Sequence, residues 1–215
     1  VADTKRQEEG SLLTFYYAIN NGSNLDPYED EDLVSALKVV YPDAFSDNAK
    51  WYKTFLKQAR VLCQWMGHRE GTSDKSYSYG RWGSNSINGI PTSQYTKIYE
   101  DIFDQFTTDQ KDLFGKGSGV KDSWNTTDVY ISKTNEERDI KSTVFNVVKD
   151  SLSDLIGSKD AAEIEVACIN RYLASLVRNK TLVGISLKET DYGEPKVTET
   201  NVGATFITEL GTLNG

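Results

Sequence analysis

The sequence has little of the chemistry that nucleophilic enzymes use, because it contains one histidine and two cysteines among 215 residues. Histidine is the usual general base beside a serine or cysteine nucleophile, so such a mechanism would depend on His68. His68 follows Gly67, at which a helix is expected to end, and this position is typical of a helix cap. We interpret His68 as a cap, and a Ser–His–Asp or Cys–His mechanism is the alternative.

The two cysteines, Cys63 and Cys168, lie within predicted helices and are far apart in the sequence. A disulfide framework or a metal site needs more partners than these two residues supply. Free cysteine behaves as a small apolar residue, and we expect both thiols to be buried and reduced. Such thiols indicate that the chain folds in a reducing compartment.

Long hydrophobic runs are also missing. No apolar stretch approaches the ~20 residues that span a bilayer, and the mean hydropathy is -0.53. The first ten residues, VADTKRQEEG, are polar and charged, so we expect no signal peptide and no membrane partner. The net charge of -8 opposes extensive electrostatic wrapping of nucleic acid, which needs a cationic surface. A local basic cleft remains compatible with this charge.

Apolar residues at helical spacing predict that most of the chain is helical. Asp47 is a candidate N-cap of the third predicted helix. A turn at residues 157–158 makes the last two predicted helices an antiparallel hairpin. The predicted helices cover residues 5–20, 26–40, 47–66, 93–106, 107–114, 136–156 and 160–178. The second of them begins with the acidic stretch 26–32. Side chains expected to be largely buried in them are Trp51, Phe55, Leu62, Ile140, Val144, Val148, Ile164 and Leu173.

Residues 71–91 show no periodicity and are rich in glycine, serine, tyrosine and asparagine. We interpret this segment as a long ordered loop that covers apolar surface. The alternative is a stacking platform for single-stranded nucleic acid, because aromatic and basic side chains alternate there. The side chains of that platform would be Tyr77, Tyr79, Arg81 and Trp82.

Two short apolar runs are typical of strands: residues 128–132, around Val129-Tyr130-Ile131, and residues 182–188. They bracket the helical hairpin, so we expect them to be neighbours in one sheet. The fold class is therefore a mostly helical α/β domain with a small mixed sheet. We expect a single domain over residues 1–215, in which a helical part (1–115) precedes a small-sheet core (120–208) with the hairpin 136–178. Two further strand-like runs cover 196–201 and 204–207.

Asp128 and Lys188 lie on these two predicted strands and form the sharpest chemical pattern in the sequence. Metal-dependent cleavage of a phosphodiester needs oxygen ligands for the metal and a cation that stabilises developing charge. Asp128 could supply the carboxylate, Lys188 the cation, and the carbonyl of Leu187 a further ligand. Glu8 or Glu9 on the first helix could point at the same site.

This layout resembles the PD-(D/E)XK, or restriction-endonuclease-like, superfamily. The resemblance assigns the helix acid to Glu8 (or Glu9), the strand aspartate to Asp128 and the acid-x-lysine triplet to Ser186-Leu187-Lys188. The segments WNTTDVYI and LVGISLK also resemble uncharacterised proteins of tailed bacteriophages, in which W-N-x-x-D and G-I-S-L-K strands recur. Ser186 departs from the superfamily because a hydroxyl is a poorer magnesium ligand than a carboxylate.

The resemblance implies a sheet of restriction-endonuclease-like type in which the helical hairpin is a long insertion. It also implies a phage-type nuclease-like DNA-processing protein, catalytically active or inactive, with Mg²⁺ as cofactor if active. Asp128 and Lys188 would then be catalytic, and Asp128, Glu8, Glu9 and Ser186 would be the candidate metal ligands. A positive cleft around Lys121, Lys133, Lys180 and Lys188 would bind DNA.

The alternative is a non-enzymatic virion structural or assembly protein, such as a head, neck or decoration component. In that interpretation Asp128 ends a strand in a network of turn hydrogen bonds, and a flat apolar interface replaces the positive cleft. The partners are DNA in the first interpretation and other phage structural proteins in the second, and a homo-oligomer stays open in both. The expected location is the host cytoplasm, the virion or both.

Overall fold

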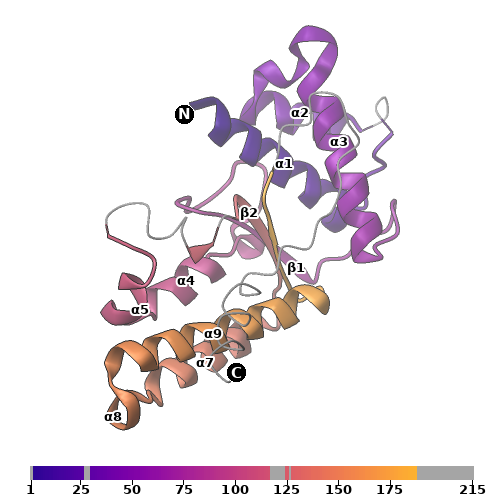
Figure 1. The fold of residues 1–215 in the computed structure, drawn as a ribbon. Helices are drawn as coiled ribbons and strands as arrows, with labels where there is room; N and C mark the ends of the chain where they lie inside the picture. The colour runs from indigo at the N-terminus through magenta and orange to yellow at the C-terminus, as the bar shows by residue number, and fades with distance from the viewer. Residues whose placement is uncertain (1, 27–29, 117–123, 126, 188–215) are drawn as a thin grey trace, which may run out of the picture.

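A three-stranded sheet at the centre of the molecule carries helices on both faces (Figure 1). The computed structural model describes residues 2–26, 30–116, 124, 125 and 127–187. The strands are β1 (Tyr77–Arg81), β2 (Val129–Lys133) and β3 (Leu182–Ile185), in the order β1-β2-β3. The first helical layer is α1 (Ala2–Asn20), α2 (Glu31–Val40), η1 (Pro42–Phe45) and α3 (Ser46–Met66). The second contains η2 (Thr92–Gln94), α4 (Ile98–Asp104), α5 (Thr108–Asp112), α7 (Glu137–Lys149), α8 (Ser153–Ile156) and α9 (Ser158–Arg178).

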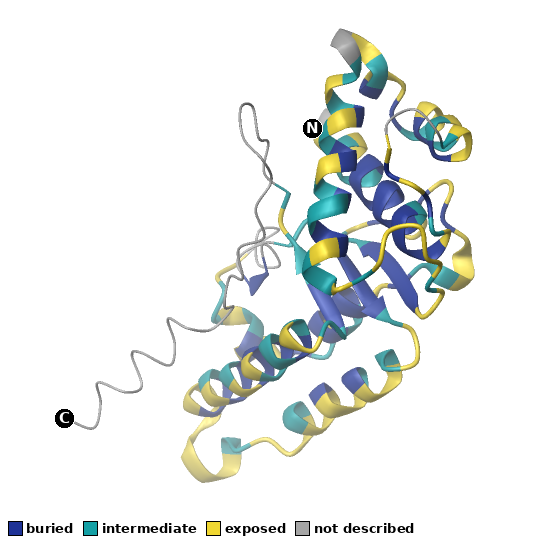
Figure 2. Cartoon of the chain, turned by 90° about the vertical axis from the view of Figure 1, so that its right-hand side faces the viewer, coloured by how far each residue is buried: buried dark blue, intermediate teal, exposed yellow. Residues whose placement is uncertain are grey.

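The central strand β2 divides the apolar interior into two cores. Val129 and Ile131 belong to the core beneath α1 and α3, whereas Tyr130 points into the core formed with α4, α7 and α9. Neighbouring side chains of a strand point to opposite faces, so one continuous apolar run serves both layers. All three residues have no exposed surface, and most of the sheet is dark in the burial view (Figure 2).

The first core depends on a close approach of α1 to α3. A Cβ added at Gly10 would lie 2.6 Å from Cε2 of Phe55, so only glycine lets the aromatic ring pack against the backbone of α1. Phe55 is 1% exposed. Gly67 then ends α3 with a positive φ of 71°, as a C-terminal glycine commonly does.

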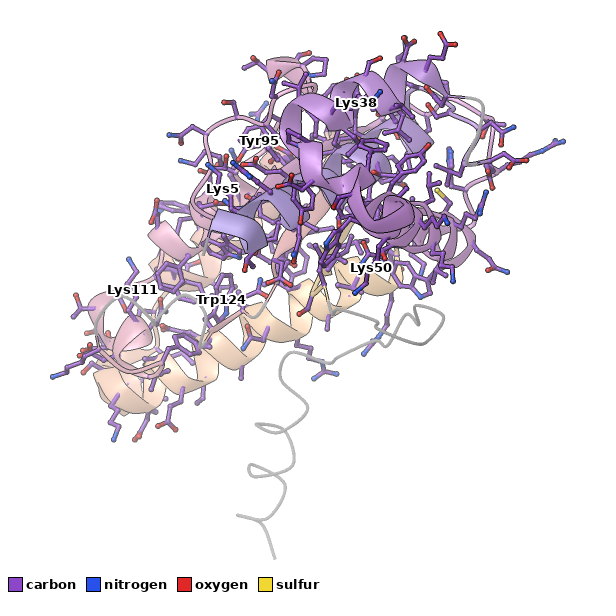
Figure 3. All side chains as sticks on the ribbon, turned by 90° about the horizontal axis from the view of Figure 1, so that it is seen from above. Lys5, Lys38, Lys50, Tyr95, Lys111 and Trp124 are labelled. Atoms are coloured by element: carbon purple, nitrogen blue, oxygen red, sulfur yellow. The ribbon has the colours of Figure 1, made fainter. Side chains whose placement is uncertain are left out.

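The second core contains an aromatic cluster around Trp124. Its ring lies 5.0 Å from Phe106, 5.6 Å from Phe103 and 6.0 Å from Tyr99, measured between centroids. Its Nε1 donates to Asn170 on α9 at 3.0 Å, which satisfies the one polar group of the indole. Seen from above, Trp124 lies at the end of the molecule near Lys111, away from Lys38 and Lys50 (Figure 3).

The prediction that the strands near residues 128–132 and 182–188 are neighbours is confirmed, because β2 and β3 pair directly. The expected mixed sheet is corrected: both strand pairings of the described residues are antiparallel. A single parallel bridge joins Tyr79 to Tyr95 outside the named strands. The runs predicted as strands at 196–201 and 204–207 lie outside the described residues.

The interpretation of residues 71–91 as a loop is wrong for β1, which pairs with β2 from Tyr77↔Lys133 to Arg81↔Val129. The supposed helical part of the chain therefore contributes an edge of the sheet. Gly80 faces Tyr130 so closely that a Cβ would overlap the tyrosine ring. Tyr79 is fully buried in the first core, so its ring packs inside the protein and is not available to stack on a nucleic-acid base.

The predicted helix 136–156 is broken after Lys149, and the chain resumes helically only at α8 and α9. Glu165 on α9 stabilises the break, because its carboxylate accepts from the amide of Leu152 at 3.0 Å and from Gln110 at 2.6 Å.

The N-cap of α3 is Phe45 and not Asp47. The capping box at Thr107 and Gln110 confirms a short helix beginning there.

Most of the predicted core residues are buried, but Ile164 is 36% exposed and Cys168 is also exposed. The buried stripe of α9 runs instead through Ala162, Glu165, Val166, Ile169, Leu173 and Leu176. Trp51 and Val148 are partly buried, while Phe55, Leu62, Ile140, Val144 and Leu173 are buried as predicted. Cys63 is buried and free, and burial raises the pKa of its thiol to about 12.

Two alanine substitutions on α9 should separate the buried from the exposed face. Leu173→Ala removes a side chain that is 5% exposed, so we expect a loss of about 2–5 kcal/mol in unfolding free energy. Ile164→Ala on the same helix should change it by less than about 0.5 kcal/mol, since it leaves no cavity. Equal losses in chemical denaturation would contradict this assignment of faces.

Gly10 and Phe55 provide a second test by a double-mutant cycle. Gly10→Ala should destabilise the protein by about 1–3 kcal/mol, because the new methyl group overlaps the Phe55 ring. In a Phe55→Leu background the same substitution should cost less, since the ring edge is gone. Additive costs in thermal or urea unfolding would show that the two residues do not share this contact.

Candidate functional site

Asp128 lies at the end of the sheet where β2 begins and β3 ends. Its Oδ2 accepts from the amide of Leu187 at 2.6 Å and from Oγ of Ser186 at 3.4 Å. Its own amide donates to the carbonyl of Ile185 at 3.0 Å, one bond beyond the β2–β3 ladder. Antiparallel pairing thus brings together residues that are 58 positions apart in the sequence.

Glu8 reaches the same end of the sheet from α1 and forms an ion pair with Arg81, the last residue of β1. Nε of Arg81 donates to Oε2 of Glu8 at 2.5 Å, and the two side chains are 15% and 14% exposed. Nη1 of Arg81 also donates to the carbonyl of Trp82 at 3.1 Å. Arg81 is opposite Val129 in the β1–β2 register, which places its backbone beside the start of β2.

The charges of this site act on one another. Burial raises the pKa of Glu8, the nearby Arg81 charge opposes that effect, and the charges of Asp128 and Glu9 raise it further. Glu8 and Asp128 are therefore close enough to repel each other when both are ionised. A site with two ionised carboxylates and one arginine keeps a net negative charge that attracts a cation.

Glu9 is partly buried one residue further along α1. It forms an i, i+4 ion pair with Lys5 at 3.6 Å, and the lysine is 57% exposed. Lys5 projects from the outer end of α1 (Figure 3). Glu9 thus pairs with Lys5, whereas Glu8 pairs with Arg81 at the end of the sheet, so Glu9 is a more remote candidate ligand than Glu8.

The predicted basic cleft does not form around Asp128 from Lys133 and Lys180. Lys133 ends β2, about 16 Å along the strand from Asp128 at 3.3 Å per residue. Its amide donates to Thr181, next to Lys180, so both lysines lie at the opposite end of the sheet. Lys180 stacks over the ring of Trp65 there. Lys121 and Lys188 lie outside the described residues.

His68 lies near Asp74 at this opposite end, just past the end of a helix as predicted. Its amide donates to Cys63 at 2.8 Å just past the end of α3, and Nε2 is 3.0 Å from the carbonyl of Thr72. Although burial opposes it, hydrogen bonds from Ser76 and the charges of His68 and Lys133 lower the pKa of Asp74. This cluster is separate from the Asp128 site.

The described residues supply two carboxylates and a hydroxyl at the Asp128 site, and no group of three or more acidic, histidine or cysteine ligands occurs among them. Mg²⁺ is commonly held by one or two carboxylates together with waters and substrate phosphates. Glu8 and Asp128 fit that type of site in donor chemistry. Arg81 competes with a metal ion for Glu8, which lowers the affinity expected of the pair.

Arg81 is the functional residue that sequence reasoning misses at this site. In the sequence Arg81 stands only within an aromatic–basic segment, because β1 lacks the continuous apolar run that predicts a strand. A signal was present: Tyr77-Ser78-Tyr79 alternates aromatic and small polar side chains, as strands do.

Comparison with protein families, curated proteins and solved structures finds no match for this chain. No helix in the described ranges has the length and apolar composition of a membrane span.

The pKa of Glu8 should respond in opposite directions to its two neighbours. Asp128→Asn removes a negative charge and should lower the pKa of Glu8, whereas Arg81→Gln removes a positive charge and should raise it. Carboxyl-detected NMR titration measures both shifts. Asp109→Asn, at an exposed position on α5, is the control and should leave the pKa of Glu8 unchanged.

The raised pKa of Glu8 also affects stability. The native protein binds this proton at pH values where the unfolded chain has lost it, so Glu8 makes the unfolding free energy fall as pH rises between the two pKa values. Glu8→Gln should remove this part of the pH dependence. An unchanged pH profile of unfolding would show that Glu8 titrates normally.

Proposed function

We propose that this chain is a nuclease-like DNA-processing protein of the kind found in tailed bacteriophages, with its site at Glu8, Asp128 and Ser186. The observation that carries the proposal is the hydrogen bonding of Asp128 to both Ser186 and Leu187 across the β2–β3 pair. An aspartate at the start of one strand, beside the triplet position at the end of its antiparallel neighbour, resembles the restriction-endonuclease-like layout, from which Ser186 departs because it stands in place of an acid. The segment α7–α9 between the strands then corresponds to the long helical insertion.

In this proposal Glu8 and Asp128 hold a divalent cation, and Ser186 supports it weakly as a neutral oxygen. Such a cation, when bound, polarises a phosphoryl oxygen and lowers the pKa of a bound water. Asp128 is positioned for this role by the amide of Leu187, which fixes Oδ2 and orients the carboxylate. Lys188 would stabilise negative charge at the scissile phosphate.

A second candidate, a non-enzymatic virion structural or assembly protein, is favoured by a different observation. Four large apolar side chains are exposed on helices α7, α8 and α9: Phe145 by 51%, Leu155 by 81%, Ile156 by 43% and Ile164 by 36%. Large exposed apolar side chains are candidates for an interaction surface. Under this candidate Asp128 serves only to connect the end of β3 to the start of β2.

Cleavage of single- and double-stranded DNA with and without Mg²⁺ or Mn²⁺ tests the nuclease proposal. We expect divalent-dependent cleavage that falls by roughly 10²-fold or more in Asp128→Asn, since the carboxylate charge is lost. The asparagine oxygen can still accept from Leu187, so the unfolding free energy should change little. Asp109→Asn serves as the matched control for loss of one surface carboxylate.

Asp128→Ala separates the chemical from the structural role, because it removes the acceptor as well as the charge. It should lower the unfolding free energy by about 1–3 kcal/mol through the unpaired amide of Leu187. If the wild type shows neither cleavage nor a calorimetric signal for Mn²⁺, the nuclease proposal is overturned. A concentration-dependent oligomer that Leu155→Glu disrupts would then support the assembly protein.

A further inference from the structure

Arg81 brings a positive charge directly to the carboxylate that the proposed metal site needs. Its guanidinium donates from Nε to Glu8 and from Nη1 to the carbonyl of Trp82, within the described part of the chain. Arginine has five N–H donors in a planar fork, so these two bonds use part of its capacity. The side chain lies at the end of the sheet and is 15% exposed, so part of it faces solvent.

The surroundings make the ion pair with Glu8 replaceable. Asp128 and Glu9 add negative charge around Glu8, the partner of Arg81, and Lys5 forms its ion pair with Glu9. The guanidinium is weakly hydrated and matches the geometry of a phosphate, which it can bind with two parallel hydrogen bonds. A phosphodiester at Asp128 would thus offer Arg81 an anion in place of Glu8.

We propose that Arg81 is the phosphate-binding residue of this site, and that Glu8 and a DNA phosphodiester compete for its guanidinium. The inference rests on the proposed function. Glu8 is also a candidate ligand for a divalent cation, so both ligands favour the arrangement in which Arg81 has left Glu8. Binding of DNA and of a divalent cation is then positively coupled, and the coupling is reciprocal.

The first experiment measures the affinity of a short fluorescent DNA duplex by anisotropy in EDTA. Glu8→Gln frees the guanidinium and should tighten binding by roughly tenfold. Glu9→Gln removes one negative charge from the adjacent position without releasing Arg81, and it should give a much smaller gain. The gain of Glu8→Gln should disappear in the double variant Glu8→Gln/Arg81→Gln.

The second experiment measures Ca²⁺ and Mn²⁺ binding by calorimetry in the absence of DNA. Arg81→Gln should strengthen cation binding several-fold, because Glu8 no longer has an internal partner, and should weaken DNA binding in Ca²⁺ by roughly tenfold. Lys141→Gln is the control, since it removes one lysine from an ion pair with Asp101 on the other face of the sheet. It should change neither affinity.

The outcomes separate this inference from the proposed function. Wild-type protein that binds neither cation nor DNA overturns both. Cation and DNA binding that Asp128→Asn abolishes but Arg81→Gln leaves unchanged overturns the role of Arg81 alone. Weaker cation binding in Arg81→Gln also overturns it, because Arg81 would then serve to position Glu8. If Arg81→Gln fails to fold, Arg81→Lys should still bind DNA more weakly, as it keeps the charge and loses the fork.

Discussion

The fold depends on one strand that is bonded along both edges and buried on both faces. β2 pairs with β1 on one side and β3 on the other, and its alternating side chains enter two separate cores. A strand in this position favours apolar residues on both faces, which explains the unbroken run Val129-Tyr130-Ile131, although Ser132 in the same strand is buried too. The same strand fixes the place of Asp128, because the first residue before the paired segment must lie at the rim of the sheet.

The sequence predicts the elements whose apolar residues are continuous or regularly spaced. The strands near Asp128 and Ser186 and the helices α1, α3 and α9 are of this kind. The sequence pattern does not predict β1, because serine and glycine interrupt its apolar residues. Glycine is needed at position 80 because Tyr130, on the neighbouring strand, occupies the space that a Cβ would fill. No local pattern can report such a long-range contact.

The apolar pattern of α9 predicts the wrong buried face for a related reason. Glu165 and Asn170 lie within its buried stripe, where they accept hydrogen bonds from Gln110, Leu152 and Trp124. Polar residues in a stripe shift the apparent apolar face toward Ile164 and Cys168, which are exposed. Their partners come from distant segments, so the sequence does not distinguish these residues from solvated ones.

The candidate site shows the same division between what was predictable and what was not. The closeness of Asp128 and Ser186 follows from two recognisable strands with a hairpin between them. The ion pair of Glu8 with Arg81 can be predicted only if β1 is recognised as a strand. The separation of Lys133 and Lys180 from Asp128 can be predicted only if the direction of β2 in the sheet is known. Lysines that are near the site in sequence can therefore lie at the other end of its sheet.

Assembly of this site from four distant parts of the chain also affects when it can form. Glu8, Arg81, Asp128 and Ser186 meet only after β3 has paired with β2, and that contact closes a loop of 58 positions. Contacts of large sequence separation generally form late, since their loop entropy must be overcome first. A nascent chain still attached to the ribosome has the N-terminal helices long before it has Ser186. The site is therefore absent until Ser186 has been made, and it appears when β3 pairs with β2.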